Sequence, residues 1–337
     1  MKIAVIGIGQ MGKRHAKLVS NFDRCQLVGL CDANYEAQQQ LDGFNVPFYD
    51  STKELLSSVQ PDGVIIATPS DTHLEIMELC AAYGIHALIE KPIANTNDAA
   101  ERIVALTESS DSKVLVGHHR RYNPLIQRLH SIVSNKGIGK LVAVSAIWGL
   151  MKPEDYFSQQ WRVTRPDGGP VLINLIHELD LLRYLCGEID TIGAVTSSNT
   201  RGYEVEDSVA ISMKFENGAI GTLIGSDTVT SPWSYETTTE ENPMYHHVSE
   251  NCYYFMGDLG SIGFPKMELW QYDDPHRMGW QHSLTKRLLK VDLEDPLMIQ
   301  LNHFCDVISG LSEPLTDASD ASKSLALALS VLNSGEN

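Results

Sequence analysis

Short apolar runs alternate with helical patterns through the first third of the chain. The runs occur at 3–6, 27–31, 63–67, 86–89 and 114–117, and helical spacing occurs between them at 11–20, 35–41, 72–83 and 97–109. Strands that alternate with helices form a parallel sheet that the helices cover on both faces. The pattern predicts an α/β domain with a doubly wound parallel sheet at residues 1–120.

The pattern changes near residue 121, where one more helix is followed by stretches with a period of two. These strand-like stretches are 141–148, 208–215, 218–226 and 252–256. Such a pattern with few helices predicts a second α/β domain, residues 121–337, on a large open sheet that is mostly antiparallel or mixed. Its exposed face is an expected oligomer interface, and helices at 296–308 and 317–331 are expected to pack back across the domains. The polar segment 231–242 is expected to be a long loop.

A glycine motif follows the first apolar run and indicates a strand that turns tightly into a helix. Its residues are Gly7, Ile8, Gly9, Gln10, Met11 and Gly12. The spacing G-x-G-x-x-G suits a dinucleotide pyrophosphate, which lies against backbone at a helix N-terminus. The motif alone is weak evidence, because it also occurs by chance.

Asp32 strengthens the dinucleotide hypothesis because it ends the second apolar run, where such domains place an acid for the adenosine ribose. Its carboxylate accepts hydrogen bonds from ribose hydroxyls and repels a 2′-phosphate. Ala33 and Asn34 follow, with no arginine nearby. The sequence therefore predicts NAD in preference to NADP. The alternative is that Asp32 only caps a helix or ends a strand.

Two further strand ends carry candidate cofactor-binding residues. Thr68 and Pro69 follow the run at 63–67, and His73 lies at the start of the next helix. The alternative for Ser70, Asp71 and Thr72 between them is that they only cap this helix. Glu90 and Lys91 follow the run at 86–89, and the next residue is a proline, which can adopt the cis form. Both are expected beside the nicotinamide, where the positive ring would lower the pKa of Lys91 and suit it to proton transfer.

In the second half, Gly168-Gly169-Pro170 introduces an apolar helix that polar residues interrupt at steps of three. Asn174, His177 and Asp180 are these residues. This spacing lets Asn174 and His177 reach one pocket. Asp180 would then orient them or cap a helix. A single histidine in an apolar helix is more often a core residue than a catalytic one.

Composition narrows the function classes. The 337 residues are 43% hydrophobic and 20% charged, which is typical of a globular chain with room for two cores. The formal net charge of −17 disfavours nucleic acid and anionic membranes as partners and favours small molecules. Six scattered cysteines, no metal-ligand spacing and no secretion signal or membrane span indicate reduced thiols, no metal site and a cytoplasmic location.

These residues together resemble the glucose-fructose oxidoreductase, inositol 2-dehydrogenase and rhizopine-catabolism (Gfo/Idh/MocA) oxidoreductases, over nearly the whole chain. The resemblance rests on 7–12, 67–70, 90–92, the segment His118-His119-Arg120-Arg121-Tyr122-Asn123-Pro124, and the Gly-Gly…His177…Asp180 helix. It implies an N-terminal Rossmann domain, a C-terminal domain with a large open sheet, and dimers or tetramers assembled through that sheet.

The resemblance also implies an activity: hydride transfer between NAD(P) and a secondary alcohol or hemiacetal carbon of a sugar, cyclitol, sugar acid or related polyol. Lys91 and His177 would act in proton transfer and contact the substrate. Further residues implied to line the substrate pocket are Arg121, Tyr156, Trp161 and Arg162, and Asn174 is expected there from its spacing to His177. Many members carry an aspartate four residues before the histidine, where this chain has Ile173. Isoleucine can neither bond a hydroxyl nor relay a proton, which puts the usual substrates in doubt.

Two other functions stay open on the sequence. One is a redox-neutral cycle of elimination or glycoside cleavage through transient oxidation by bound NAD. The other is a non-catalytic NAD-binding sensor, in which Lys91 and His177 would be idle.

Overall fold

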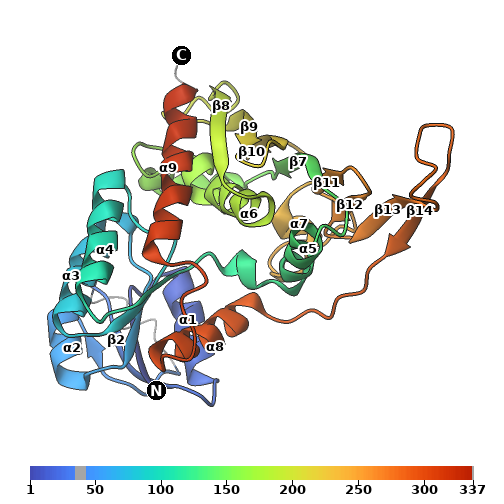
Figure 1. Ribbon diagram of the computed structural model, residues 1–337. Helices are drawn as coiled ribbons and strands as arrows, with labels where there is room; N and C mark the ends of the chain where they lie inside the picture. The colour runs from blue at the N-terminus through green and yellow to red at the C-terminus, as the bar shows by residue number, and fades with distance from the viewer. Residues whose placement is uncertain (35–42, 336–337) are drawn as a thin grey trace. The chain divides into compact units, whose positions relative to one another are not determined.

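The computed structural model describes residues 1–34 and 43–335 (Figure 1). The helix predicted at 35–41 lies outside them. The chain divides into two compact units, each described by itself. Unit 1 comprises Met1–His119 and Leu297–Ala326, and unit 2 comprises Arg120–Pro296 and Leu327–Asn337.

Unit 1 contains a parallel sheet with the strand order β3-β2-β1-β4-β5-β6. The strands are β1 (Lys2–Ile6), β2 (Gln26–Cys31), β3 (Phe48–Tyr49), β4 (Gly63–Ile66), β5 (His86–Ile89) and β6 (Val114–Val116). Its helices are α1 (Gln10–Ser20), α2 (Thr52–Val59), α3 (His73–Ala82), α4 (Asn97–Ser109), nearly all of α8 (Pro296–Ile308) and the first half of α9 (Ala318–Ser334). This is the doubly wound sheet that the sequence predicts.

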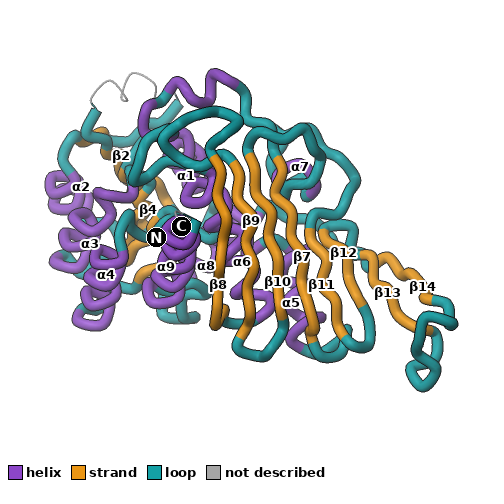
Figure 2. The backbone as a smooth tube through the Cα atoms, turned by 90° about the horizontal axis from the view of Figure 1, so that it is seen from above, coloured by secondary structure: helices purple, strands orange, loops and turns teal. Residues whose placement is uncertain are grey.

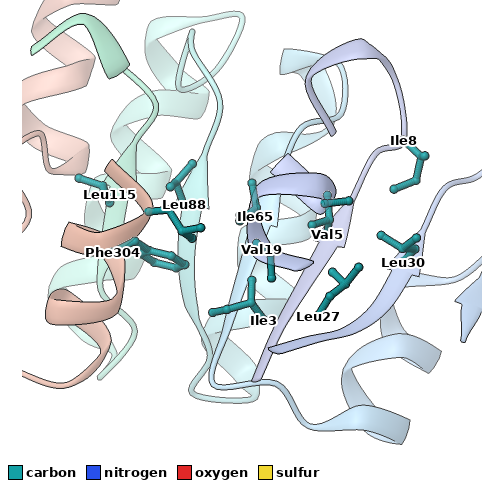
Figure 3. Close-up of a cluster of buried hydrophobic side chains, with 12 residues drawn as sticks. Ile3, Val5, Ile8, Val19, Leu27, Leu30, Ile65, Leu88, Leu115 and Phe304 are labelled. Atoms are coloured by element: carbon teal, nitrogen blue, oxygen red, sulfur yellow. The ribbon is translucent and has the colours of Figure 1, made fainter. Parts of the chain in front are cut away.

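The core of unit 1 forms where α1 and α8 meet the sheet. Figure 3 shows Val5 and Leu88 of the strands, Val19 of α1 and Phe304 of α8 gathered in one buried cluster. A Cβ on Gly63 would lie 3.0 Å from the Phe304 ring, so glycine permits the close approach of α8 to β4. Residues 297–308 of the helix expected at 296–308 thus belong to unit 1, while packing across the two domains stays a prediction.

Unit 2 contains a mixed sheet with the order β14-β13-β12-β11-β7-β10-β9-β8, in which only the β7–β10 pair is parallel. The strands are β7 (Leu141–Gly149), β8 (Ile189–Ser197), β9 (Ser208–Phe215), β10 (Ile220–Ser226), β11 (Tyr253–Gly257), β12 (Ser261–Phe264), β13 (Glu268–Tyr272) and β14 (Leu284–Leu288). The helices are α5 (Pro124–Ser134), α6 (Ile176–Cys186) and α7 (Tyr235–Thr238).

The two faces of this sheet differ in burial. Successive residues of β9 and β10 alternate between buried and exposed, and Figure 2 shows α5 and α6 on one face only. The other face presents apolar side chains to solvent. These include Val142, Val195, Ile220, Ile224 and Tyr254.

Two local predictions are wrong. The segment 231–242 is not a continuous loop, because Ser234 accepts a hydrogen bond from the Thr237 backbone N–H and caps the short helix α7. The apolar helix expected after Gly168-Gly169-Pro170 is divided, with a wider π-helical turn at Val171–Leu175 followed by α6. The strands β8, β12, β13 and β14 and the elements α2 and β3 were not expected.

Candidate functional site

The glycine loop between β1 and α1 requires glycine at two positions for steric reasons. Gly7 has φ +87°, and a Cβ there would lie 2.6 Å from the backbone of Ala67 and Thr68. A Cβ on Gly12 would lie 1.8 Å from the Gly7 carbonyl oxygen. Around Gly9 the situation is opposite, because a Cβ would meet no described atom within 4 Å. The N-terminus of α1, which includes Gln10 and Met11, therefore opens onto free space, as a pyrophosphate site requires.

Asp32 lies directly after β2 and contacts this loop. Its Oδ2 accepts the Ile8 backbone N–H at 2.7 Å, and its Oδ1 accepts the Asn34 N–H at 2.9 Å. A carboxylate has roughly four acceptor positions, so these two bonds leave capacity for a ribose. The loop and the acid lie side by side in unit 1, and they fit NAD.

Thr68 and Pro69 follow β4, as expected, but His73 is deeply buried. Its ring nitrogens lie 3.0 Å from the Thr68 carbonyl oxygen and 3.1 Å from that of Ile93. Burial lowers the pKa of His73. The structure thus shows His73 anchoring the segment that carries Thr68 and Pro69, while a direct contact with the cofactor stays a prediction.

Glu90 and Lys91 follow β5, and the Lys91–Pro92 bond is cis. Glu90 is buried, and its Oε1 lies 2.8 Å from Nε2 of His15 on α1. Burial alone would raise the pKa of Glu90, but the hydrogen bond to His15 and the charges of His15, His119 and Lys91 lower it to about 2. The carboxylate is therefore ionised, so His15 donates. Its other oxygen accepts the Lys91 backbone N–H at 3.3 Å, which holds the segment in place.

In unit 2, Arg121 and Asp180 form a buried pair. Arg121 donates from Nε to Oδ2 at 2.8 Å and from Nη2 to Oδ1 at 2.6 Å, and it stacks over Tyr184 at 4.9 Å. Asp180 lies inside α6 and does not cap it. Because Nε and Nη2 of Arg121 both donate to Asp180, this pair supports a role for Arg121 in holding α6 in place.

His177 lies in the first turn of α6 and is 6% exposed, and Asn174 is half-buried in the π-helical turn before it. Asn174 Oδ1 accepts a hydrogen bond from Nζ of Lys152 at 2.7 Å. Lys152 follows β7 and is itself only 6% exposed. The structure therefore adds a buried cation next to Asn174 that sequence reasoning missed.

The predicted pocket residues Tyr156, Trp161 and Arg162 lie on the segment after Lys152. The Arg162 guanidinium stacks on the Tyr156 ring at 4.0 Å and donates to the Tyr156 carbonyl at 2.7 Å. Trp161 is 48% exposed and lies 5.4 Å from Arg162. Burial raises the pKa of Tyr156 to about 12, so its hydroxyl stays protonated.

Another buried cluster that the sequence did not reveal surrounds Arg120. Arg120 donates to Glu178 at 2.6 Å and to Glu236 at 2.7 Å, and Tyr253 donates to Glu178 at 3.0 Å. Burial raises the pKa of Glu178 to about 7 despite Arg120. The only signal in the sequence was a charged residue inside an apolar helix, which does not identify its partners.

Other features of the described residues bear on the class of site. All six cysteines are free. No group of three or more histidine, cysteine, aspartate or glutamate side chains arranged for a metal ion occurs in the described part of the chain. Among the described helices, none has the length and apolar character to cross a membrane.

Several solved structures share this fold. The WlbA dehydrogenase from Bordetella pertussis, crystallised with NADH and UDP-GlcNAcA, matches with a TM-score of 0.78 at 22% identity over 100% of this chain and 97% of that chain. An oxidoreductase from Thermotoga maritima matches with a TM-score of 0.84 at 21% identity over 99% of this chain and 96% of that chain. At such identity the likeness concerns the fold.

Three curated relatives are similar in sequence over part of their length. The rhizopine catabolism protein MocA of Rhizobium meliloti is 27% identical over 59% of this chain and 61% of its own. The myo-inositol 2-dehydrogenase of Thermotoga maritima is 26% identical over 67% of this chain and 68% of its own. The D-apiose dehydrogenase of Paraburkholderia graminis is 31% identical over 64% of this chain and 58% of its own. The chain thus spans about three fifths to two thirds of the length of these relatives.

Two domain models of one family match the chain. The oxidoreductase family with NAD-binding Rossmann fold matches residues 1–118, and the GFO/IDH/MocA C-terminal domain matches residues 126–263. Together they cover the glycine loop, Asp32, Lys91 and His177. The chain belongs to the Gfo/Idh/MocA oxidoreductase family and carries its NAD-binding Rossmann fold.

Proposed function

We propose that the protein is an NAD-dependent dehydrogenase that acts on a secondary alcohol or hemiacetal carbon of a sugar, cyclitol or sugar acid. The observation that carries the proposal is the bond between His15 and Glu90, which joins the helix after the glycine loop to the segment that presents Lys91. The names of the relatives, which include dehydrogenases of inositol and apiose, support this substrate class.

The proposal assigns a role to each of the two domains expected from the sequence. Residues 1–120 bind the cofactor, and residues 121–337 supply the substrate-binding residues and an oligomer interface. Asp32, followed by Ala33 and Asn34, supports NAD over NADP because a carboxylate repels a 2′-phosphate. In the cofactor site, Gly7, Ile8, Gly9, Gln10, Met11 and Gly12 hold the pyrophosphate, Asp32 holds the ribose, and Thr68, Pro69, His73, Glu90 and Lys91 complete the site.

Lys91 and His177 carry the proton transfer. Bound NAD supplies the acceptor for the hydride that leaves the substrate carbon. His177 takes the hydroxyl proton on its imidazole, and the Lys91 ammonium donates a hydrogen bond to the same oxygen and stabilises its developing negative charge. The carbon–oxygen bond becomes a carbonyl, and the reverse sequence reduces it.

Oligomer formation and location complete the proposal. A homodimer or homotetramer assembled through the uncovered face of the eight-stranded sheet is supported by the apolar residues exposed there, such as Val195 at 72% and Ile220 at 59% exposure. A cytoplasmic location is supported by the six free cysteines.

A panel of sugars, cyclitols and sugar acids, incubated with the protein and NAD, tests the activity by absorbance at 340 nm. Accumulation of NADH with at least one polyol is the expected result. Conversion of a substrate without any accumulation of NADH would overturn net oxidation in favour of the redox-neutral cycle. Binding of NAD without conversion of any compound would favour a sensor.

A further inference from the structure

A hollow of about 340 Å³ lies on the uncovered face of the eight-stranded sheet. Tyr254, Met256 and Trp270 stand around it, and their side chains are 42%, 36% and 38% exposed. Strand pairing explains the hollow, because Tyr254 and Met256 of β11 lie opposite Gly263 and Ser261 of β12. Two small residues thus lie among larger ones. We call this feature the β11–β13 hollow.

The floor of the hollow is fixed by the backbone at Gly263. A Cβ there would lie 2.5 Å from Nδ2 of Asn251, so the position does not admit a larger side chain unless that amide shifts. Asn251 is buried and donates to Glu268 at 2.9 Å. Ser261 and Glu268, which also line the hollow, offer acceptors for the N–H of an aromatic occupant.

The hairpin of β13 and β14 carries a tryptophan that its own chain leaves in solvent. Trp280 lies in the connection between the two strands and is 99% exposed. The ladder between the strands ends at the pair of Tyr272 and Leu284, so Trp280 lies beyond the strand ends. Figures 1 and 2 show this hairpin extending away from the rest of the sheet of unit 2. The indole therefore does not enter the hollow of its own chain.

One chain thus carries a large apolar side chain and an aromatic hollow without joining them. Full burial of a tryptophan removes about 150–250 Å² of surface from water, and tryptophans set into pockets dominate the energetics of many interfaces. A two-fold interface uses the same patch on both copies, so a projection and a hollow of one chain serve each other across the axis.

Two further observations favour a second copy as the partner. The hollow continues into the apolar part of the face, since Tyr254 lies opposite Ser145 of β7, and Ile220 and Ile224 of β10 pair with the same strand. The hairpin segment 273–290 also has four basic residues against two acidic ones, in a chain with a net charge of −17. An acidic second copy therefore attracts this segment at long range.

We propose that Trp280 of each copy inserts into the β11–β13 hollow of a second copy, in a two-fold dimer through the uncovered face of the sheet. The indole packs against the rings of Tyr254 and Trp270, and its N–H donates to Ser261 or Glu268. This inference rests on the oligomer in the proposed function and names a contact that holds it together.

Sedimentation velocity of the full chain over a range of concentrations measures the dissociation constant of the dimer. Trp280→Ala removes the inserted side chain, and Ser261→Phe fills the hollow. Each should weaken the dimer at least about 30-fold, with the circular dichroism spectrum and NADH affinity retained. Leu311→Ala is the matched control, because it removes a side chain of unit 1 that is 74% exposed, and it should leave the dissociation constant unchanged.

A mixture of the two variants gives a sharper test. Trp280→Ala keeps its hollow and Ser261→Phe keeps its tryptophan, so a mixed dimer regains one of the two contacts. It should form more tightly than the dimer of either variant alone. The emission of Trp280, taken as the difference between wild type and Trp280→Phe, should be shielded from acrylamide above the dissociation constant and accessible below it.

The outcomes separate this contact from the rest of the proposed function. Equal dissociation constants of wild type and Trp280→Ala, or no gain on mixing, would overturn the contact and leave the hollow to another occupant. Shielding of Trp280 in the monomer would place the indole in its own chain and overturn the contact as well. A wild-type chain that stays monomeric at every concentration would overturn both the contact and the oligomer. The dehydrogenase is tested separately by NADH formation.

Discussion

His15 and Glu90 lie 2.8 Å apart, and their hydrogen bond links α1 to the segment after β5. Glu90 also accepts the Lys91 backbone N–H, and a Cβ on Gly117 would lie 3.2 Å from its carboxyl group. The carboxylate is thus enclosed by the helix that starts at the glycine loop, by the proposed catalytic lysine and by the end of β6. A change at Glu90 should therefore affect both stability and the presentation of Lys91.

Replacement of Glu90 by glutamine should lower the free energy of unfolding at neutral pH. It should also make that free energy less sensitive to a fall in pH. The pKa of Glu90 is about 2 in the folded protein against an ordinary value of 4.5. A lowered carboxyl pKa contributes to the free energy of unfolding above pH 4.5, and this contribution is lost as the pH falls towards 2. For Glu90 the contribution amounts to about 3 kcal/mol. Urea unfolding of wild type and Glu90→Gln at pH 7 and pH 3 measures this.

The exposed pair of Glu78 and Arg102 provides a control for that experiment. Glu78→Gln removes a surface ion pair of 2.5 Å and should cost less than about 1 kcal/mol at either pH. An equal loss of stability between pH 7 and pH 3 in wild type and Glu90→Gln would contradict the role of this carboxylate.

Alanine at Gly9 and at Gly12 should have different effects. At Gly12 the new Cβ would clash with the Gly7 carbonyl, so Gly12→Ala should lower stability. At Gly9 it would meet no protein atom, so Gly9→Ala should fold normally but bind NADH at least about tenfold more weakly, because the methyl group takes space needed by the pyrophosphate. Thermal unfolding and NADH fluorescence titration separate the two. Normal NADH affinity in Gly9→Ala would place the cofactor elsewhere.

Lys91→Met should retain NAD binding and lose turnover. The methionine keeps the length and apolar contacts of the lysine stem but cannot donate to the substrate oxygen, so kcat should fall by about 10²–10⁴. Stopped-flow absorbance at 340 nm measures the chemical step, and NADH titration measures binding. Turnover within a few-fold of wild type would remove Lys91 from the mechanism.

His177→Asn should lower kcat/KM and change its pH profile. A general base makes the oxidation rate rise with pH until the base is deprotonated, whereas asparagine has no such titration. The expected profile of the variant is flat over the range in which the wild type rises. A profile that keeps the wild-type shape would show that another group takes the proton.

The pair of Arg121 and Asp180 should contribute to stability more than to substrate binding. Both side chains are almost fully buried, and removal of one leaves an uncompensated charge, at a cost of about 3–5 kcal/mol. Arg121→Met and Asp180→Asn should therefore each destabilise unit 2, and the double variant should lose less than the sum of the two. Additive losses in urea unfolding would contradict a coupled pair.

The predictions from sequence succeed where a single local pattern determines the outcome. The strand at 86–89 and the helix at 97–109 have the predicted bounds because apolar periodicity and the Thr96 cap specify them locally. The glycine loop is equally local, since Gly7 and Gly12 contact backbone within the same turn or at the end of β4. In the same way, the end of β2 places Asp32 beside Ile8.

Residues whose role depends on distant partners were not recognised from the sequence. Lys152 contacts Asn174 and Asp227, which lie far from it along the chain, and nothing near Lys152 in the sequence indicates them. Strand β14 was missed because all five of its residues are exposed, so it lacks the alternation that marks a half-buried strand. Such features follow from sheet topology, which fixes strand neighbours that periodicity alone does not determine.

The division of the chain into two units gives each its own optical signal. All five tryptophans, residues 148, 161, 233, 270 and 280, belong to unit 2. Trp148 is fully buried, whereas Trp280 is 99% exposed. Tryptophan emission therefore reports the melting of unit 2 alone, while dinucleotide fluorescence reports the site on unit 1. Coincident melting curves would show that the two units lose their structure in one step, and separated curves that they do so in two.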